Sequence, residues 1–416
     1  MKVTKTLILA CLVIVCNLGH GQLSDGAHRS EYYAVLPFWE SPYQPVKGGY
    51  PITEEEALHR INLKVDYNAS NQVIATHVRI GEEYKEFEGR FGNLNINAPH
   101  TKITHSPDKE VHHFFDRFGN QIFVMGKVYA KIYEKDALGR NISLTFIDAN
   151  GEPVSDWFGV MRYQWFHEPN GSIIEERLDS NGELVPLRGE FHFLRTRMTF
   201  DGYGYFGTLE NVDAEGNLVN TDNGAAFFKY YYDFQGRFDR WEVFDANGKP
   251  AIGPSHTAGE QNVWNGYELE DIVFFDQQKN PTTHWSGAER WHFETDGFGN
   301  RTLLEFQDGE GNPKNANGGY AKYVAEWTVN GKHLLSETYL DEKGLKAVHR
   351  ISGVNRVEYV RNPLGLILEK RYLDKEHNLM NRKDNGVALE KKRYDVNHAL
   401  ITTELFDVHG NHIQNP

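Results

Sequence analysis

A four-residue turn of the form Asp-x-x-Gly recurs along this 416-residue chain at a nearly constant interval, and it limits the fold more than any other feature. Successive copies begin 31 to 34 residues apart. Such a period is typical of repeat proteins, in which each unit buries its apolar face only by stacking on its neighbours. We call these turns the first series: Asp116–Gly119, Asp148–Gly151, Asp179–Gly182, Asp213–Gly216, Asp245–Gly248, Asp276–Lys279, Asp308–Gly311, Asp341–Gly344, Asp374–His377 and Asp407–Gly410.

A second series of turns alternates with the first, and each copy begins 11 to 13 residues before the next turn of the first series. In such turns the Asp side chain accepts hydrogen bonds from the backbone, and Gly accepts the positive φ at which the chain reverses. The copies are Asp136–Gly139, Glu168–Gly171, Asp201–Gly204, Asp233–Gly236, Val263–Gly266, Asp296–Gly299, Thr328–Gly331, Asn362–Gly365 and Asp395–His398.

The segments between the turns are about eight residues long and rich in Tyr, Phe, Trp and Val, as in 227–232 and 240–244, which is typical of strands. A single hairpin is only marginally stable in water, so the hairpins must stack. The sequence therefore predicts an all-β fold: tandem β-hairpin repeats of about 32 residues, stacked into an elongated or coiled antiparallel sheet with an N-terminal cap. The expected core is the aromatic side of this sheet, and it includes Phe244, Phe306, Tyr339, Tyr372 and Phe406.

The start of the chain reads as a secretory signal over residues 1–21, with an early positive charge, an apolar run at 7–15 and small residues before the expected cleavage site. We therefore predict a secreted or extracytoplasmic protein without a membrane span. Lipid anchoring at Cys11 or Cys16 is the less favoured alternative, because Val15 precedes Cys16 and the apolar run before Cys11 is very short.

Three parts are predicted: the signal at 1–21, an N-terminal cap with a degenerate repeat at 22–106, and about ten β-hairpin repeats at 107–416. Within the cap, Tyr67–Asn71 resembles a degenerate turn of the series. Thr53 and Glu56 are spaced as in a capping box, which predicts a helix over 53–60.

Two strings carry a resemblance to a known class of repeats: YYDFQGRF at 231–238 and RYDVNH at 393–398. They resemble the YD repeats of bacterial RHS-type and wall-associated proteins. The layout of the unit is also similar to repeat arrays in secreted bacterial proteins related loosely to MORN-type hairpin repeats. The resemblance covers about three quarters of the chain and implies architecture only. Few copies keep the full Tyr-Asp pair, and no toxin-like C-terminal domain is found, so a shell that encloses a toxin is not expected.

The net charge of -14 argues against nucleic acid as a partner and against docking on anionic lipid. The leading interpretation is a binding module whose repeated surface contacts a glycan or an extracellular protein. The side chains proposed to stack on a ligand are Trp241, Trp285, Trp291 and Trp327, each of which has a place in the core as its alternative.

The rival interpretation is a secreted enzyme of unrecognised class near the irregular unit at 251–294. Its acid–base candidates are His256, His284, His292 and Glu294. On a strand, Arg290, His292 and Glu294 share one face, and the simpler alternative is a polar outer face over a packed inner one. No cofactor motif is found, and no metal site is predicted.

A row of acidic residues precedes the first-series turns. One interpretation is a row of ligands for a cation or a basic partner, and the simpler one is a solvated face paired with Lys and Arg of neighbouring strands. Its members are Glu176, Glu210, Glu242, Glu305 and Glu404.

Overall fold

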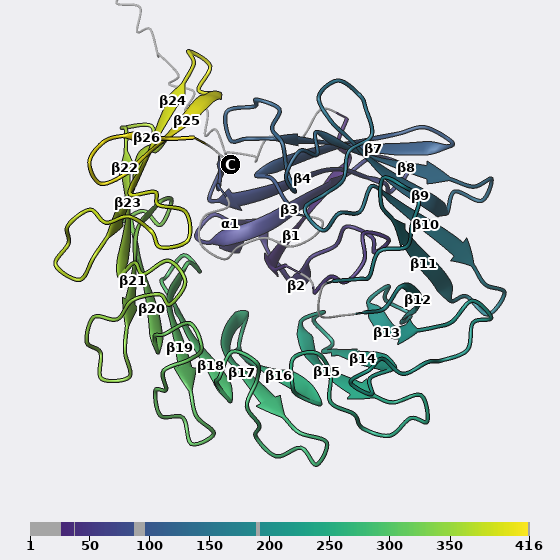
Figure 1. Ribbon diagram of the computed structural model, residues 1–416. Helices are drawn as coiled ribbons and strands as arrows, with labels where there is room; N and C mark the ends of the chain where they lie inside the picture. The colour runs from purple at the N-terminus through teal and green to yellow at the C-terminus, as the bar shows by residue number, and fades with distance from the viewer. Residues whose placement is uncertain (1–25, 37, 87–95, 189–191, 415–416) are drawn as a thin grey trace, which may run out of the picture.

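The computed structural model describes residues 26–36, 38–86, 96–188 and 192–414, and within these ranges almost every regular element is a β-strand. The strands form one 26-stranded sheet in which successive strands pair antiparallel (Figure 1). The prediction of an all-β fold of stacked hairpins is confirmed. This sheet fits the YD- and RHS-like hairpin repeats that the sequence resembles. The predicted signal at 1–21, with Cys11 and Cys16, lies outside the described residues.

The cap contains the first elements of the chain. They are β1 (Arg29–Val35), β2 (Gly49–Ile52), α1 (Glu54–Ala57), β3 (Ile61–Tyr67), β4 (Val73–Ile80) and β5 (Glu83–Tyr84). Strand β1 pairs with β2 and β3, and β3 pairs with β4. The helix has the predicted capping box: the Thr53 hydroxyl accepts the Glu56 N–H at 3.2 Å, and the Glu56 carboxylate accepts the Thr53 N–H at 2.7 Å.

The rest of the described chain consists of consecutive hairpins. They are β6 (His100–His105) with β7 (Lys109–Phe115), β8 (Ala130–Lys135) with β9 (Asn141–Ile147), β10 (Arg162–His167) with β11 (Ile173–Leu178), β12 (Arg195–Phe200) with β13 (Phe206–Asn211), β14 (Phe227–Tyr232) with β15 (Phe238–Phe244), β16 (Gly259–Asn265) with β17 (Glu268–Phe275), β18 (Arg290–Thr295) with β19 (Arg301–Gln307), β20 (Lys322–Trp327) with β21 (Leu334–Leu340), β22 (Arg356–Arg361) with β23 (Ile367–Leu373), and β24 (Leu389–Tyr394) with β25 (Leu400–Phe406), followed by β26 (His412–Ile413). Strand β6 also pairs with β4, so the cap and the repeats share one sheet. The boundary expected at 106/107 falls in the turn between β6 and β7.

The turns have the chemistry that the sequence predicts. Asp245 accepts the backbone N–H groups of Asn247 and Lys249 at 2.9 and 2.8 Å, and Gly248 lies at φ 77°. The same left-handed backbone occurs where glycine is missing, at Lys279, His377 and His398, with φ of 66°, 65° and 68°. Turns that begin with Asp are therefore held by bonds within the turn itself, as at Asp245–Lys249.

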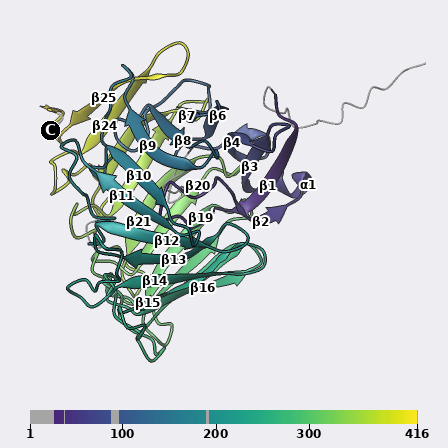
Figure 2. The same cartoon turned by 90° about the vertical axis from the view of Figure 1, so that its right-hand side faces the viewer.

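The strip of hairpins curves round until its last units lie beside its first ones (Figure 1). The Arg117 guanidinium donates to the Leu364 carbonyl, Asn120 Nδ2 donates to the Asn397 carbonyl at 3.0 Å, and the ring of Phe118 lies 4.7 Å from that of His398. These contacts come from turns. Among the described strands β26 pairs with β25 alone, so the sheet is not closed into a barrel. The cap strands β1 and β3 lie at one end of the coil (Figure 2).

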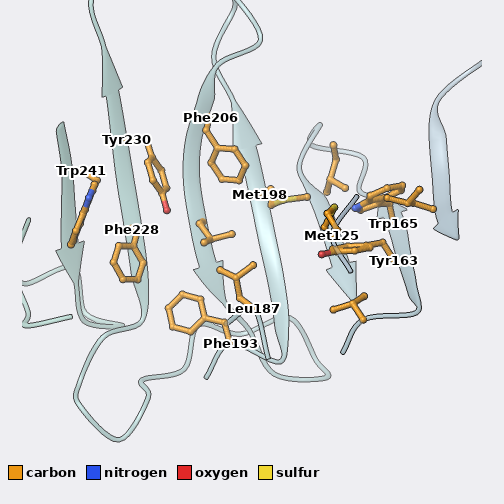
Figure 3. Packing of buried hydrophobic residues seen from close by; sticks show 14 of the residues in the cluster. Met125, Tyr163, Trp165, Leu187, Phe193, Met198, Phe206, Phe228, Tyr230 and Trp241 are labelled. Atoms are coloured by element: carbon orange, nitrogen blue, oxygen red, sulfur yellow. The ribbon is translucent and has the colours of Figure 1, made fainter. Parts of the chain in front are cut away.

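The core lies on the face of the sheet that contacts the chain segment 38–46 of the cap. Phe38 stacks on Phe238 with ring centroids 4.3 Å apart, and Tyr43 packs edge-on against Trp165. Figure 3 shows this cluster, which includes Phe193, Phe206, Phe228, Tyr230 and Trp241. We call this side of the sheet the inner face.

Some of the expected core residues lie where they were predicted, and others do not. Phe306 and Tyr372 are buried, whereas Tyr339, Phe406 and Phe244 are only half-buried. Phe244 follows the buried Val243 on β15, so its side chain points to the opposite face, where it stacks on Phe227 at 4.9 Å. The expectation for Phe244 was wrong because aromatic residues occupy both faces of this hairpin.

Candidate functional site

His284 is a packed side chain in the loop before β18. Its ring stacks on Phe274 with centroids 4.3 Å apart, and it meets Trp291 edge-on at 5.1 Å. Its Nδ1 lies 3.0 Å from the Ser286 hydroxyl. Burial, with a smaller contribution from the charge of His256, lowers the pKa of His284 to about 4. The imidazole is therefore neutral at neutral pH and is held in place by aromatic contacts.

The other residues of the predicted acid–base group are divided between two surroundings. His256 is exposed, in a loop where its φ is 66°, and it lies close enough to His284 to influence its pKa. His292 Nδ1 lies 3.0 Å from Asp271 Oδ1, and Glu294 is exposed on the same strand. His292 follows Trp291, whose ring contacts His284, so His284 and His292 lie on opposite faces of the sheet. The structure thus groups His256 with His284, and His292 with Asp271.

The four predicted tryptophans also differ in their surroundings. Trp241 is 7% exposed within the core cluster. Trp291 is partly buried and donates its indole N–H to Ser286 Oγ at 3.1 Å. Trp327 donates to the Arg301 carbonyl at 3.0 Å, and Lys85 Nζ lies 4.3 Å from its ring centroid. Trp285, in contrast, is 57% exposed and leaves an indole surface open to a ligand.

The acidic row is paired with cations, as its simpler interpretation predicts. The pairs are Glu176 with Arg195, Glu210 with Arg197, Glu242 with Arg240 and Lys279, Glu305 with Lys322, and Glu404 with Arg393. Among the residues that the structure describes, no three His, Cys, Asp or Glu side chains are grouped to hold a metal ion. No helix in the described ranges has the length and hydropathy needed to cross a bilayer.

A pocket that the sequence did not reveal lies on the polar face of the cap sheet. Strand pairing places its residues side by side, because Lys64 on β3 is opposite His77 on β4, and His77 is opposite His100 on β6. The alternate residues Leu63 and Val65 point to the other face, where they join an apolar cluster. The polar face borders a cavity of about 640 Å³, which we call the cap pocket. Its lining includes Lys64, His77, Arg79, Tyr84, His100 and Lys102.

A fully buried carboxylate, Asp66, organises the polar side chains beneath this pocket. Asp66 accepts the Ser30 hydroxyl at 2.6 Å, and Lys64 Nζ lies 3.3 Å from the same oxygen, Oδ1. The other oxygen lies 2.9 Å from His77 Nε2. An ionised carboxylate only accepts hydrogen bonds, so Nε2 of His77 carries the proton in this contact.

His77 in turn determines how Tyr84 is bonded. With its proton on Nε2, the imidazole has its lone pair on Nδ1, and the Tyr84 hydroxyl lies 3.1 Å from that atom. Burial lowers the pKa of His77, although Asp66 opposes this shift. Burial also raises the pKa of Tyr84. At neutral pH the phenol therefore donates its O–H to a neutral imidazole.

His100 completes a stack of three rings at the pocket. Its ring lies 4.8 Å from that of His77 and 5.5 Å from that of Tyr84, with interplanar angles of 15° and 14°. Burial lowers the pKa of His100 to about 4, so its charge is absent at neutral pH. Lys64 is paired with the buried Asp66, so the net positive charge comes from Arg79 and Lys102, and among the described residues of the lining it is opposed by Glu82. The pocket is thus locally cationic in a chain whose net charge is -14.

No family model and no curated protein matches this sequence. Among solved structures, the crystal structure of TcdB2-TccC3-TEV aligns with 85% of this chain and 17% of its own, at 11% identity and a TM-score of 0.32. The crystal structure of TcdB2-TccC3 without hypervariable C-terminal region aligns with 84% of this chain and 17% of its own, at 11% identity and a TM-score of 0.30. This chain therefore spans less than a fifth of those chains.

Proposed function

We propose that this protein is a secreted binding module in which the hairpin repeats form the scaffold and the cap pocket holds an acidic sugar of a glycan. The observation that carries the proposal is a locally cationic cavity, with three stacked rings at its wall, in a strongly acidic chain. Its volume of about 640 Å³ falls in the range of roughly 300–1,000 Å³ that is usual for small-molecule sites.

The chemistry of the lining fits a sugar that carries a carboxylate. Arg79 and Lys102 supply charged donors, which form the stronger hydrogen bonds to an anionic group. His77, Tyr84 and His100 supply ring surface and polar edges to which sugar hydroxyls can bond. A hexuronic acid combines both features in one residue. We therefore propose a glycan that contains hexuronic acid as the ligand.

The test is a calorimetric titration of the full chain with oligogalacturonate, and with a neutral oligosaccharide of the same length as the comparison ligand. We expect saturable binding of the acidic oligomer only. Lys102→Glu reverses a charge at the pocket and is expected to weaken binding at least tenfold. Lys343→Glu makes the same change at an exposed first-series turn and should leave affinity unchanged. Equal weakening by both variants, or no binding at all, would refute the proposal.

A second contact region is favoured by the exposure of Trp285. Trp157 occupies the equivalent place in an earlier unit, is 67% exposed and was not among the tryptophans predicted to contact a ligand. Both lie in the loop that precedes the first strand of a hairpin. We propose this loop surface as the alternative site, for a protein ligand. Replacing both tryptophans with alanine should abolish binding of such a partner without changing oligogalacturonate affinity.

A further inference from the structure

The contacts beneath the cap pocket form a linear chain of proton-transfer groups. Asp66 lies 2.9 Å from Nε2 of His77, and Nδ1 of the same ring lies 3.1 Å from the Tyr84 hydroxyl. Enzymes activate hydroxyl groups with the same arrangement, in which a base contacts the hydroxyl and a carboxylate orients the base. Tyr84 lines the cavity, whereas Asp66 is fully buried. The reactive end of this chain of groups therefore faces the ligand.

We propose that the cap pocket is a catalytic site in which Tyr84 removes the proton next to the carboxylate of a hexuronic acid and so cleaves the glycan by β-elimination. This inference rests on the proposed function, because it requires the same acidic ligand in the same pocket. Tyr84 is the catalytic residue, since it contacts the reacting atoms. His77 and Asp66 are positioning residues, because they act through Tyr84.

The lowered pKa of His77 and the raised pKa of Tyr84 oppose this proton transfer, and two features of the pocket act in its favour. When Tyr84 loses its proton to His77, the resulting imidazolium stays in contact with Asp66, so charge separation occurs beside a fixed counter-ion. The carbon that loses a proton places negative charge on the neighbouring carboxylate group. Arg79 and Lys102 lie in the same lining and would stabilise that charge.

The reaction balances without water or a cofactor. The phenolic proton moves to Nδ1 of His77 as the Tyr84 oxygen takes the proton from C5 of the sugar. The electron pair of the C5–H bond becomes the C4–C5 double bond, and the C4–O4 bond breaks. Tyr84 then gives the proton from C5 to the departing oxygen, and His77 returns its own proton to Tyr84. One glycan chain becomes two, with a new hydroxyl on one and a 4,5-unsaturated uronate on the other.

The experiment incubates the full chain with oligogalacturonate in D2O and follows the vinyl proton of the product and deuterium at C5 by NMR. We expect product from the native protein, and a rate lowered by on the order of 10²- to 10⁴-fold in Tyr84→Phe. That variant keeps the ring stack, so its affinity by calorimetry should change less than threefold. Lys343→Glu, at an exposed turn far along the chain, should keep the full rate.

The outcomes separate the two proposals. Binding without product or deuterium exchange would overturn the catalytic inference and leave the binding function standing. Absence of binding would overturn both. Full activity in Tyr84→Phe would overturn the assignment to Tyr84. If Tyr84→Phe fails to fold by circular dichroism, His77→Gln serves in its place, and it should shift the pH profile of the rate as well as lower it.

Discussion

The cap and the hairpin β14–β15 are parts of one sheet, yet they bury different kinds of side chain. In hairpin β14–β15 the inner face holds Phe228 and Trp241, while Lys229 and Glu242 face each other on the other side. In the cap, Lys64 and Asp66 are almost fully buried on one face of β3. Burying charge is unfavourable unless it is paired and hydrogen-bonded, as Lys64 and Asp66 are. The repeats bury an ion pair as well, Arg177 with Glu175 on β11, but the buried charges of the cap lie beneath the cap pocket.

The largest loss of unfolding free energy is expected for a substitution in the aromatic core of the repeats. Phe228 is 1% exposed and packs against Phe193 and Trp241. Phe228→Ala should lower the free energy of unfolding by about 4 kcal/mol, from lost burial and the cavity left behind. Denaturant unfolding followed by tryptophan fluorescence measures it. Phe234→Ala, at a turn where the ring is 95% exposed, is the control and should cost less than about 0.5 kcal/mol.

The second-largest loss of unfolding free energy is expected when the buried charge of the cap is removed. Asp66→Ala leaves Lys64 and His77 without their shared anion. Breaking a buried pair costs about 3 kcal/mol or more, whereas an exposed pair contributes at most about 1 kcal/mol. Glu404→Ala, which removes the partner of the exposed Arg393, is the matched change in the repeats. Similar losses of unfolding free energy in both variants would show that burial does not determine the cost of removing a paired charge.

The turns of the repeats should respond more weakly. Gly248 lies at φ 77°, and an added Cβ would meet no atom within 4 Å, so Gly248→Ala introduces backbone strain alone. We expect a loss of about 1 kcal/mol in the free energy of unfolding. His377 has the same backbone at φ 65°, and His377→Gly should be neutral or slightly stabilising. A larger loss from His377→Gly than from Gly248→Ala would show that these turns are not governed by φ.

The smallest expected effect is on how stability depends on pH, and it has opposite signs at two turns. Asp148 and Asp156 each accept two backbone N–H groups, but Asp148 is only half-buried and Asp156 is buried. Backbone hydrogen bonds from Glu152 and Asn150 lower the pKa of Asp148, whereas burial raises that of Asp156 to about 6. The contribution of Asp156 to stability is thus present at low pH and lost as pH rises from about 4 to about 6. That of Asp148 is present at neutral pH and lost on acidification.

Thermal unfolding as a function of pH measures these two contributions. Asp156→Asn should raise the melting temperature relative to the native protein at pH 7, with a difference that disappears near pH 4. Asp148→Asn should lower it slightly at pH 7, again with no difference in acid. The same sign for both variants at pH 7 would show that burial does not distinguish these turns.

The repeat architecture could be predicted because its turns are encoded locally. Each such turn needs only five consecutive residues, as at Asp245–Lys249. The Asp side chain accepts the backbone N–H groups of the residues two and four positions further on, and the residue between these two has a positive φ. The capping box of α1 is equally local. Which face of a strand is buried is not local, because aromatic residues at Phe227 and Phe228 leave both faces apolar. That is why Trp241 was considered for a ligand and lies in the core.

The cap pocket could not be predicted, because its residues come together only through pairing of β3, β4, β5 and β6. Lys64 and Asp66 alternate with apolar residues, a pattern that usually indicates a solvent-exposed face. His77, Tyr84 and His100 are spread over 24 positions and share no known motif. The histidines at 284 and 292 stand closer in the sequence, yet strand alternation places them on opposite faces.

The central claim, that the cap rather than the repeats holds the ligand, is tested most directly by the histidine resonances of the full chain. Oligogalacturonate is titrated into histidine-labelled protein, and the imidazole signals of His77 and His100 are followed together with those of His284 and His292. We expect saturable shifts for His77 and His100 and constant positions for His284 and His292. Shifts confined to His284 and His292 would place the site in the repeats and contradict the account.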